Sequence, residues 1–287
     1  MSRRTSTTIG VAAAVLAAAL FGLTWRNMST RDASRVETRG RPVTTTVAPR
    51  LVPAPAPSPS TTAAPVLGGT RDPETGTRLR LGYARPPAMP AKVADAVVPT
   101  VGLYNAPGDA EAADSLDNPT WEGLPGVYLV QQEYGDWLEV QIPMRPNEST
   151  AWIRKADVSI RQTQYRIVVN VSERRLVAYD GPTPFLDTTV AVGASSGPTP
   201  RGNFFVDGTV PIDDPTGPYG AYQMSVAAFS DVYQTFGGGI GQIALHGTND
   251  PALLGTPASH GCVRMTNEAI TLLANTAPPG TPVQIIG

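Results

Sequence analysis

Short runs of alternating apolar and polar residues, separated by turn-forming residues, dominate the chain from residue 76 onward. Within residues 76–162 the runs "GVYLVQ", "DWLEVQI" and "TAWIRKADVSI" follow one another closely. Alternation with a period of two indicates strands that bury one face. This part of the chain is therefore predicted to form a small antiparallel β-barrel.

The part from residue 163 to 287 shows the same period in further runs. "YRIVVNV" and "RRLVAYD" predict a hairpin, with Tyr165, Ile167, Val169 and Val171 on one face. More strands are predicted at "LDTTVAVGA", "GNFFVDGTV", "GQIALHG" and the C-terminal "TPVQIIG". We expect these runs to form a second, β-rich domain.

A single helix is predicted in this second domain, from about Asn267 to Ala274. Thr266 or Asn267 can cap its N-terminus, Glu268 favours its first turn, and "PPG" ends it. The sequence has no internal repeat and no Gly-rich phosphate loop. The predicted fold class is therefore mostly β, with one clear helix.

Residues 1–27 have a different pattern. Arg3 and Arg4 precede an apolar run at 9–25, "IGVAAAVLAAALFGLTW", which as a helix would span about 26 Å, the short limit for crossing a bilayer. No clear Ala-x-Ala cleavage site follows, so we predict a membrane anchor, with a cleaved signal peptide as the alternative. Five Arg residues between 26 and 41 oppose export by the positive-inside rule, but large domains translocate regardless of charge.

Residues 28–75 are predicted to form an extended linker. The stretch 42–65 has seven prolines and almost no large apolar side chains, so it cannot bury enough surface to offset its ordering entropy. Residues 1–65 carry a net charge of +6, which leaves −8 on residues 66–287 for a total of −2. An acidic folded part argues against nucleic acid as a partner.

Every histidine and the single cysteine lie in one window of 17 residues: His246, His260 and Cys262. Random placement would group them this closely about 1% of the time. Zinc is disfavoured as a ligand of this window because the chain has no fourth His or Cys. A buried, inert thiol is a second interpretation. We expect no metal, no cofactor, and a reactive cysteine.

Nucleophilic catalysis suits these residue types best. A thiol is mostly protonated near pH 7 and needs an adjacent base, for which imidazole is suited. In an extended segment His260 and Cys262 would share one face. In a tight turn at Gly261 they would separate, and His246 would be the nearer base. The amides of Gly261 and Cys262 are candidates for an oxyanion hole.

The sequence "HGT…TPASHGCVRM" resembles the signature of the YkuD-type L,D-transpeptidase catalytic domain. That signature is a histidine, a spacer, and then Ser/Thr-His-Gly-Cys with an Arg or Asn soon after. "GPTPRGNF" at 197–204 resembles a turn of the same family, and the resemblance covers roughly residues 164–287. Less specifically, Trp137, the "RPN" turn at 145–147 and Trp152 resemble bacterial SH3-like domains.

The resemblance implies that Cys262 attacks the bond before the terminal D-alanine of a peptidoglycan stem tetrapeptide. D-Alanine leaves, a thioester forms, and an amine of a neighbouring stem resolves it into a cross-link. His246 is then the general base, with its ring held by the backbone carbonyl of Gly247, while Gly261 supplies an amide and His260 orients the site.

The residues assigned to substrate binding are Arg264, Ser259, Tyr222 and Met224. Arg264 offers a fixed cation and a bidentate fork for a carboxylate of the stem peptide. A structural salt bridge is the alternative role for Arg264. Core packing is the alternative for Tyr222 and Met224.

Other functions stay open on the sequence. With water as acceptor, the same site would be an L,D-carboxypeptidase. A papain- or NlpC-like peptidase is disfavoured because its cysteine precedes its histidine, and a sortase because its cysteine follows a Thr-x-Thr context. A non-catalytic wall-binding protein is the alternative from another class. The transpeptidase interpretation implies an extracytoplasmic place in the cell envelope, with stem peptides as partners and membrane contact through residues 9–25.

Overall fold

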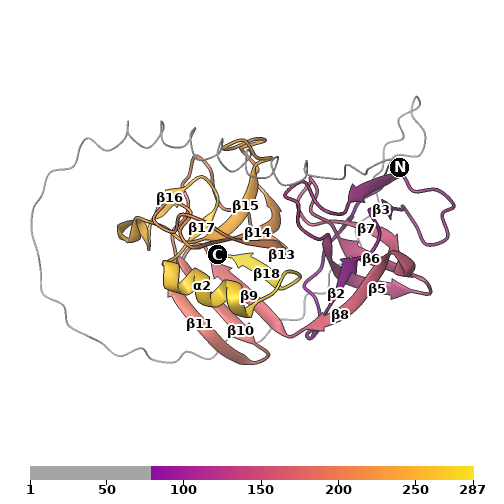
Figure 1. Ribbon diagram of the computed structural model, residues 1–287, viewed down its shortest axis with the longest axis horizontal. Helices are drawn as coiled ribbons and strands as arrows, with labels where there is room; N and C mark the ends of the chain where they lie inside the picture. Colours follow the sequence, from indigo (N-terminus) through magenta and orange to yellow (C-terminus); the bar gives the residue numbers. More distant parts are fainter. Residues whose placement is uncertain (1–78) are drawn as a thin grey trace, which may run out of the picture. The chain divides into compact units, whose positions relative to one another are not determined.

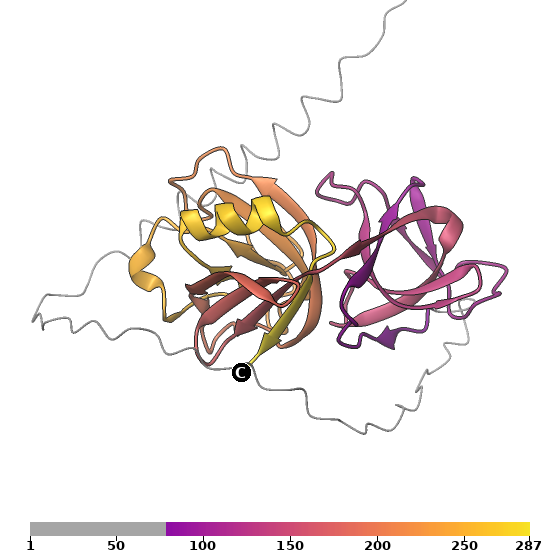
Figure 2. The same cartoon turned by 90° about the horizontal axis from the view of Figure 1, so that it is seen from below.

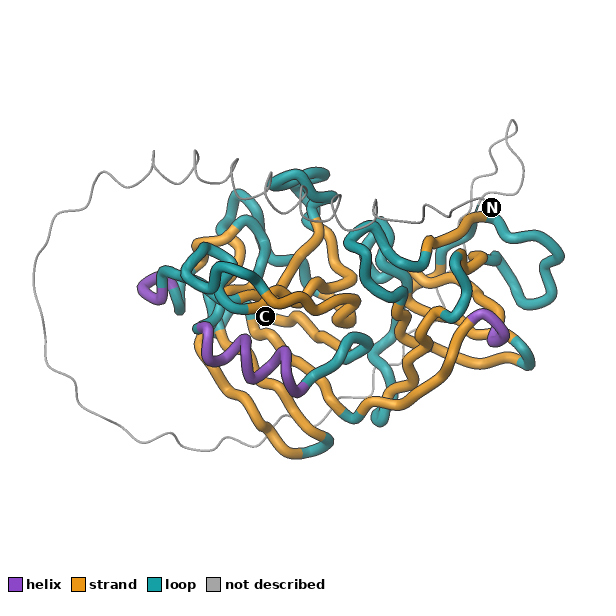
Figure 3. The backbone as a smooth tube through the Cα atoms, viewed as in Figure 1, coloured by secondary structure: helices purple, strands orange, loops and turns teal. Residues whose placement is uncertain are grey.

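The computed structural model of the protein describes residues 79–287. The predicted membrane segment at 9–25 and the predicted linker at 28–75 lie outside the described residues. Residues 79–287 belong to one compact unit, in which strands predominate over helices (Figure 3). Within that range no helix is long and apolar enough to cross a membrane. The predicted mostly β fold class is confirmed for this part of the chain.

Residues 79–163, the N-terminal β region, are built from short strands (Figure 1). The elements are β1 (Gly82–Tyr83), β2 (Ala91–Ala96), β3 (Thr100–Leu103), β4 (Asp114–Asp117), β5 (Val127–Tyr134), β6 (Trp137–Gln141), β7 (Ser149–Arg154), the 3-10 turn η1 (Lys155–Asp157) and β8 (Val158–Thr163). A six-stranded sheet runs in the order β1-β7-β6-β5-β2-β8, and β3 pairs with β4. Its pairs are antiparallel, as the period of two predicts. The likeness to SH3-like domains stays a prediction.

Alternation along these strands produces the core of the N-terminal β region. In β6, Leu138 and Val140 are fully buried, while Trp137 and Glu139 between them are partly exposed. Leu138 lies opposite Ile153 of β7, which is also fully buried. The inward face of each strand therefore supplies one side of a closed apolar cluster.

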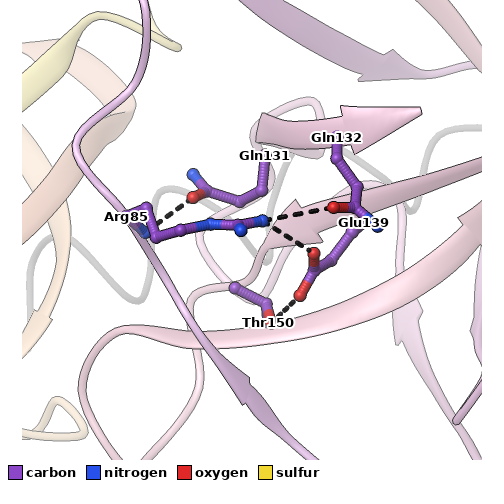
Figure 4. A network of polar contacts seen from close by, with 5 residues as sticks. All are labelled: Arg85, Gln131, Gln132, Glu139 and Thr150. Carbon is purple, nitrogen blue, oxygen red and sulfur yellow. Dashed lines mark hydrogen bonds and ion pairs between the residues drawn. The ribbon is translucent and has the colours of Figure 1, made fainter. Parts of the chain in front are cut away.

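The segment after β1 is tied to this sheet by Arg85 (Figure 4). Its backbone N–H donates to Gln131 Oε1 at 2.7 Å, and its guanidinium reaches Gln132 Oε1 at 3.3 Å and Glu139 Oε2 at 3.4 Å. Glu139 also accepts a hydrogen bond from Thr150 Oγ1 at 2.7 Å. Because the Arg85 side chain is largely exposed, we expect this network to add little to stability. Its main effect is to fix the path of the chain after β1.

Residues 164–287, the C-terminal β region, form a longer sheet that curls around its core (Figure 2). The elements are β9 (Tyr165–Asn170), β10 (Arg175–Asp180), β11 (Thr183–Thr189), β12 (Val192–Gly193), β13 (Gly202–Pro211), β14 (Tyr222–Phe229), β15 (Gln242–His246), the 3-10 turn η2 (Pro251–Leu253), β16 (Pro257–Ser259), β17 (Val263–Arg264), α2 (Asn267–Thr276) and β18 (Pro282–Ile286). The eight-stranded sheet has the order β11-β10-β9-β18-β13-β14-β15-β17, and β12 pairs with β16.

The predicted hairpin and helix are both confirmed. β9 and β10 pair antiparallel, with Ile167 and Val169 buried in the core. α2 begins at the predicted residue and ends at Thr276, two residues beyond the predicted end. Of the two predicted caps it is Thr266 whose side chain accepts from the Ala269 amide, at 3.2 Å. The helix packs against β14, β15 and β11 and so covers one face of the sheet that carries the histidine-cysteine window.

β14 is the longest of the strands that the sequence pattern does not predict. Six of its eight residues are buried, because both faces of the strand are covered. Met224 and Val226 face the core of the C-terminal β region. Ala227 belongs instead to a small second cluster with Phe205 of β13 and Leu129 of β5. Period-two alternation is lost when a strand is buried on both faces.

A buried polar cluster lies where the loop before β5 meets the sheet. The Ser225 hydroxyl donates to Glu122 Oε2 at 3.2 Å, and Gln242 Nε2 donates to Asp207 Oδ2 at 2.6 Å. Burial raises the pKa of Asp207 to about 7; hydrogen bonds from Ser225 and Gln242 oppose this shift, and the nearby Glu122 adds to it. Burial also raises the pKa of Glu122. Two carboxyl groups therefore share a site that disfavours their charged forms.

Asp207→Asn is expected to stabilise the protein at pH 8. The folded-state pKa lies above the unfolded value, so the free energy of unfolding of the wild type falls as pH rises from about 4 to about 7. An amide carries no such penalty and still accepts from Gln242. We expect a gain of about 2 kcal/mol at pH 8 and little difference at pH 4.5, measured by denaturant unfolding. A variant less stable than the wild type at pH 8 would contradict the burial argument.

Candidate active site

β15 and β17 bring the window together as neighbouring parallel strands. Leu245 pairs with Val263 and His246 with Arg264, and the Met265 amide donates to the His246 carbonyl at 3.0 Å. Immediately before β17, Cys262 faces the Ala244 amide. Positions two apart on a strand share a face. Cys262 and His246 are therefore diagonal neighbours on one face of the sheet.

The orientation of the His246 ring is fixed by the backbone. His246 is buried, and its Nδ1 lies 2.6 Å from the carbonyl oxygen of Gly247. A carbonyl can only accept, so Nδ1 carries the proton and Nε2 presents a lone pair. The Tyr219 ring packs against the imidazole with a centroid separation of 4.8 Å. The arrangement holds one tautomer, the one that can take a proton at Nε2.

The His246 imidazole and the Cys262 thiol are both uncharged at neutral pH. Burial, together with the nearby Arg264 charge, lowers the pKa of His246 to about 4, against hydrogen bonding to the carbonyls of Gly247 and Tyr219. Burial raises the pKa of the Cys262 thiol, and the Ala244 amide and Arg264 oppose that shift. The resting site is thus a neutral pair, and thiolate formation needs a further change.

The turn before Cys262 is held by two hydroxyl groups. Ser259 Oγ accepts from the Gly261 amide at 3.1 Å and donates to the Cys262 carbonyl at 2.5 Å. Thr199 Oγ1 donates to the Gly261 carbonyl at 2.8 Å and accepts from the Gly193 amide at 2.8 Å. The Gly261 amide, predicted for an oxyanion hole, is therefore already engaged by Ser259, which leaves the Cys262 amide as the candidate donor.

Gly261 gives this segment its bend. Its φ is +130°, and a Cβ there would lie 2.8 Å from Ile243 Cδ1, so glycine is required. From the sequence, residues 260–262 are expected to be either extended or turned at Gly261, and the chain bends there. The side chains of His260 and Cys262 are consequently separated. The exposed His260 ring contacts Phe236 and Tyr233, with centroid separations of 4.8 and 5.7 Å.

Arg264 lies beside His246 and has no ionic partner among residues 79–287. Its Nε is buried and has no hydrogen-bond partner among residues 79–287, and no carboxylate of that range lies within ion-pair distance. Its backbone pairs with Ala191 in both directions at 2.9 Å. The structural salt bridge considered for Arg264 is therefore not formed in this part of the chain.

The two β14 residues assigned to substrate binding lie in different surroundings. Met224 is fully buried in the core cluster, so its assignment to substrate binding is wrong and core packing holds. Tyr222 is half-buried at the start of β14, and its carbonyl accepts from the Gly247 amide at 3.3 Å. Tyr222 thus contacts the residue after His246 through its backbone, while Met224 pairs with Leu245 of β15 and packs its side chain in the core.

No local sequence signal indicates the residues that hold the His246 segment on the side of Tyr219 and Gly220. Gly220 and Gly247 approach so closely that a Cβ on Gly220 would lie 2.6 Å from the Gly247 Cα and 2.0 Å from Asn267 Oδ1. Asn267 Oδ1 accepts from the Ala221 amide at 3.1 Å. This contact brings Tyr219 onto the imidazole. The dipeptide Tyr219-Gly220 indicates a turn, but no neighbouring residue indicates that this turn contacts His246.

A half-buried cysteine near a buried, neutral imidazole is a combination that cysteine acyl-transfer enzymes use. Among residues 79–287 no group of three or more His, Cys, Asp or Glu is placed to hold a metal ion. Residues 164–285 match the family model of the YkuD L,D-transpeptidase catalytic domain. This part of the chain is a YkuD-type L,D-transpeptidase catalytic domain.

Two curated relatives match 121 residues of this chain. Both carry the name "Putative L,D-transpeptidase YkuD": the protein from Bacillus licheniformis is 36% identical over 121 residues, and that from Bacillus subtilis 33%. The match covers 42% of this chain and 65% of each relative, slightly under two thirds of their length. A solved catalytic domain of an L,D-transpeptidase from E. faecium is 21% identical over 42% of this chain and 95% of that one, with a TM-score of 0.31.

Proposed function

We propose that the protein is a peptidoglycan L,D-transpeptidase that uses Cys262 as its nucleophile. The observation that carries the proposal is the diagonal placement of Cys262 and His246, with His246 Nδ1 fixed on the Gly247 carbonyl. The family match over residues 164–285 supports a stem tetrapeptide as donor. The same match supports action on the cell wall, and hence an extracytoplasmic location.

Acylation begins with transfer of the thiol proton to His246 Nε2. The sulfur attacks the carbonyl that precedes the terminal D-alanine, and the Cys262 amide donates to the oxygen that becomes negative. The C–N bond then breaks, the proton passes from His246 to the leaving amino group, and D-alanine departs. A thioester stays on Cys262 until the amine of a neighbouring stem attacks it.

Arg264 links substrate binding to the basicity of His246. Its charge lowers the His246 pKa, and its guanidinium has no carboxylate partner among the described residues. A carboxylate of the stem peptide bound there would offset that charge and raise the His246 pKa toward its ordinary value. The base is then strongest when the donor is in place, which suits general base catalysis.

The remaining assigned residues have supporting roles in this proposal. Ser259 positions the nucleophile turn through its bonds to Gly261 and Cys262. His260 is exposed and orients the bound stem, and the half-buried Tyr222 lies beside the His246 segment.

The test is incubation of the protein with a disaccharide-tetrapeptide, followed by mass spectrometry of products and of the intact protein. We expect release of D-alanine, a cross-linked dimer, and a protein mass increased by the acyl group. The disaccharide-tripeptide lacks the bond to D-alanine and serves as the matched control, with no acylation expected. Release of D-alanine without dimer would assign the carboxypeptidase reaction instead. No release and no adduct would overturn the enzymatic proposal in favour of a wall-binding protein.

A further inference from the structure

The connection between β14 and β15 borders the proposed site. This 230–241 loop, Ser230 to Gly241, carries Tyr233 and Phe236, whose rings contact His260. Tyr233 also lies on the backbone of Gly197, because a Cβ there would fall 2.5 Å from its Cε2. The loop therefore forms the wall beside His260, while β15, which follows it, ends at His246.

The loop has little regular structure of its own. Gly237, Gly238 and Gly241 have positive φ values, a conformation that glycine adopts freely and at a high entropic cost of ordering. Within the loop Phe236 and Gly239 exchange backbone hydrogen bonds. A segment of this kind keeps one conformation only if its ends are anchored.

The anchor is the "RPN" turn of the N-terminal β region. Arg145 donates from Nη1 to the Ser230 carbonyl at 2.7 Å, and from Nη2 to the carbonyls of Tyr233 and Ile240 at 3.0 and 3.2 Å. Asn147 exchanges two bonds of 2.8 Å with the backbone of Phe229. The planar guanidinium thus joins both ends of the loop with donors in a fixed fork.

We propose that Arg145 is a positioning residue for the reaction: it holds the 230–241 loop so that Tyr233 and Phe236 pack on His260 and shape the wall of the stem-peptide groove. The inference rests on the proposed function for its substrate. It acts on binding rather than on chemistry, because Cys262 and His246 are held by β15, β17 and Gly247. The N-terminal β region thereby contributes to substrate recognition without touching the thiol.

Arg145→Gln tests this in two ways. The chain has two histidines, so their imidazole proton signals are separable by NMR, and the neighbouring rings of Tyr233 and Phe236 displace the His260 signals. We expect the variant to move the His260 signals toward those of an imidazole without aromatic neighbours and to leave those of His246 in place. We also expect KM for the tetrapeptide to rise about tenfold, with kcat within about twofold of the wild type.

Arg161→Gln is the matched control. Arg161 also donates to a carbonyl of the C-terminal β region, that of Pro279 at 2.6 Å, yet its partners lie outside the 230–241 loop. This variant is expected to lower stability without changing KM or the His260 signals. In a Tyr233→Ala background, Arg145→Gln should have little additional effect on KM, because both changes act through the same contact.

The NMR measurement needs no substrate, so it decides the inference even if the proposed function fails. Unmoved His260 signals in Arg145→Gln, or equal movement of both histidines, would overturn it. So would a rise in KM that Arg161→Gln matches. Should Arg145→Gln fold poorly, Arg145→Lys keeps the charge but loses the fork, and it is expected to give the same His260 shift at smaller size.

Discussion

Replacing Cys262 by Ala is expected to abolish acylation by the stem tetrapeptide. The chain has no second thiol, so no other cysteine can replace the nucleophile. We expect kcat/KM for D-alanine release to fall by at least about 10⁴-fold, because a nucleophile acts as a unit with its base. The release of D-alanine over time, followed with the disaccharide-tetrapeptide, measures the loss.

Two controls make this result specific to the chemistry. Cys262 is partly exposed, so its loss is expected to change the free energy of unfolding by less than about 1 kcal/mol. Cys262→Ser keeps an attacking atom of lower acidity, and it should form an ester slowly, visible as the same mass increase after long incubation. An alanine variant that still releases D-alanine would exclude Cys262 as the nucleophile.

His246→Asn is expected to lower kcat/KM by about 10²–10⁴-fold, the range of general base catalysis. The asparagine amide can still donate to the Gly247 carbonyl, which the wild-type Nδ1 meets at 2.6 Å. It has no counterpart of Nε2, so the variant keeps the local hydrogen bond and removes the base. Single-turnover acylation rates measure the effect, with His260→Asn, which leaves the proposed base intact, as the comparison.

The pH dependence distinguishes a base from a structural imidazole. Because the His246 pKa is lowered to about 4 in the free protein, kcat/KM of the wild type, which reports the free enzyme, should fall only as the pH falls through about 4, where Nε2 becomes protonated. The value of kcat/KM should be retained across the ordinary histidine range near pH 6.5. His246→Asn should lack this acid limb. A wild-type limb near pH 6.5 in kcat/KM would contradict the assignment of His246 as the base.

Features with local signals could be predicted from the sequence. The β9–β10 hairpin follows from period-two alternation on both sides of a turn, and α2 follows from Thr266 and the "PPG" stop. The histidine-cysteine window was found because its residue types are rare in this chain. Each of these signals lies within a few neighbouring residues, so no tertiary information was needed.

Features that depend on distant contacts could not be predicted. Alternation stops in the second half of β14, where residues 226–229 are all apolar, because the N-terminal β region covers the face that alternation would have left polar. For the same reason the sequence could not show whether Met224 packs in the core or contacts substrate. The contacts of Tyr219 with His246 and of Thr199 with Gly261 join segments far apart in sequence. Nothing near either residue indicates its partner.

The parallel pairing of β15 with β17 has an evolutionary consequence. The separation of His246 from Cys262 is set by sheet register, with Leu245 opposite Val263 and His246 opposite Arg264, rather than by the chain that connects them. That connecting chain includes η2 and β16. Insertions and deletions in the exposed portion of this connection can therefore accumulate without changing the spacing of His246 and Cys262. The loops around the site are free to diversify between lineages while that spacing is kept.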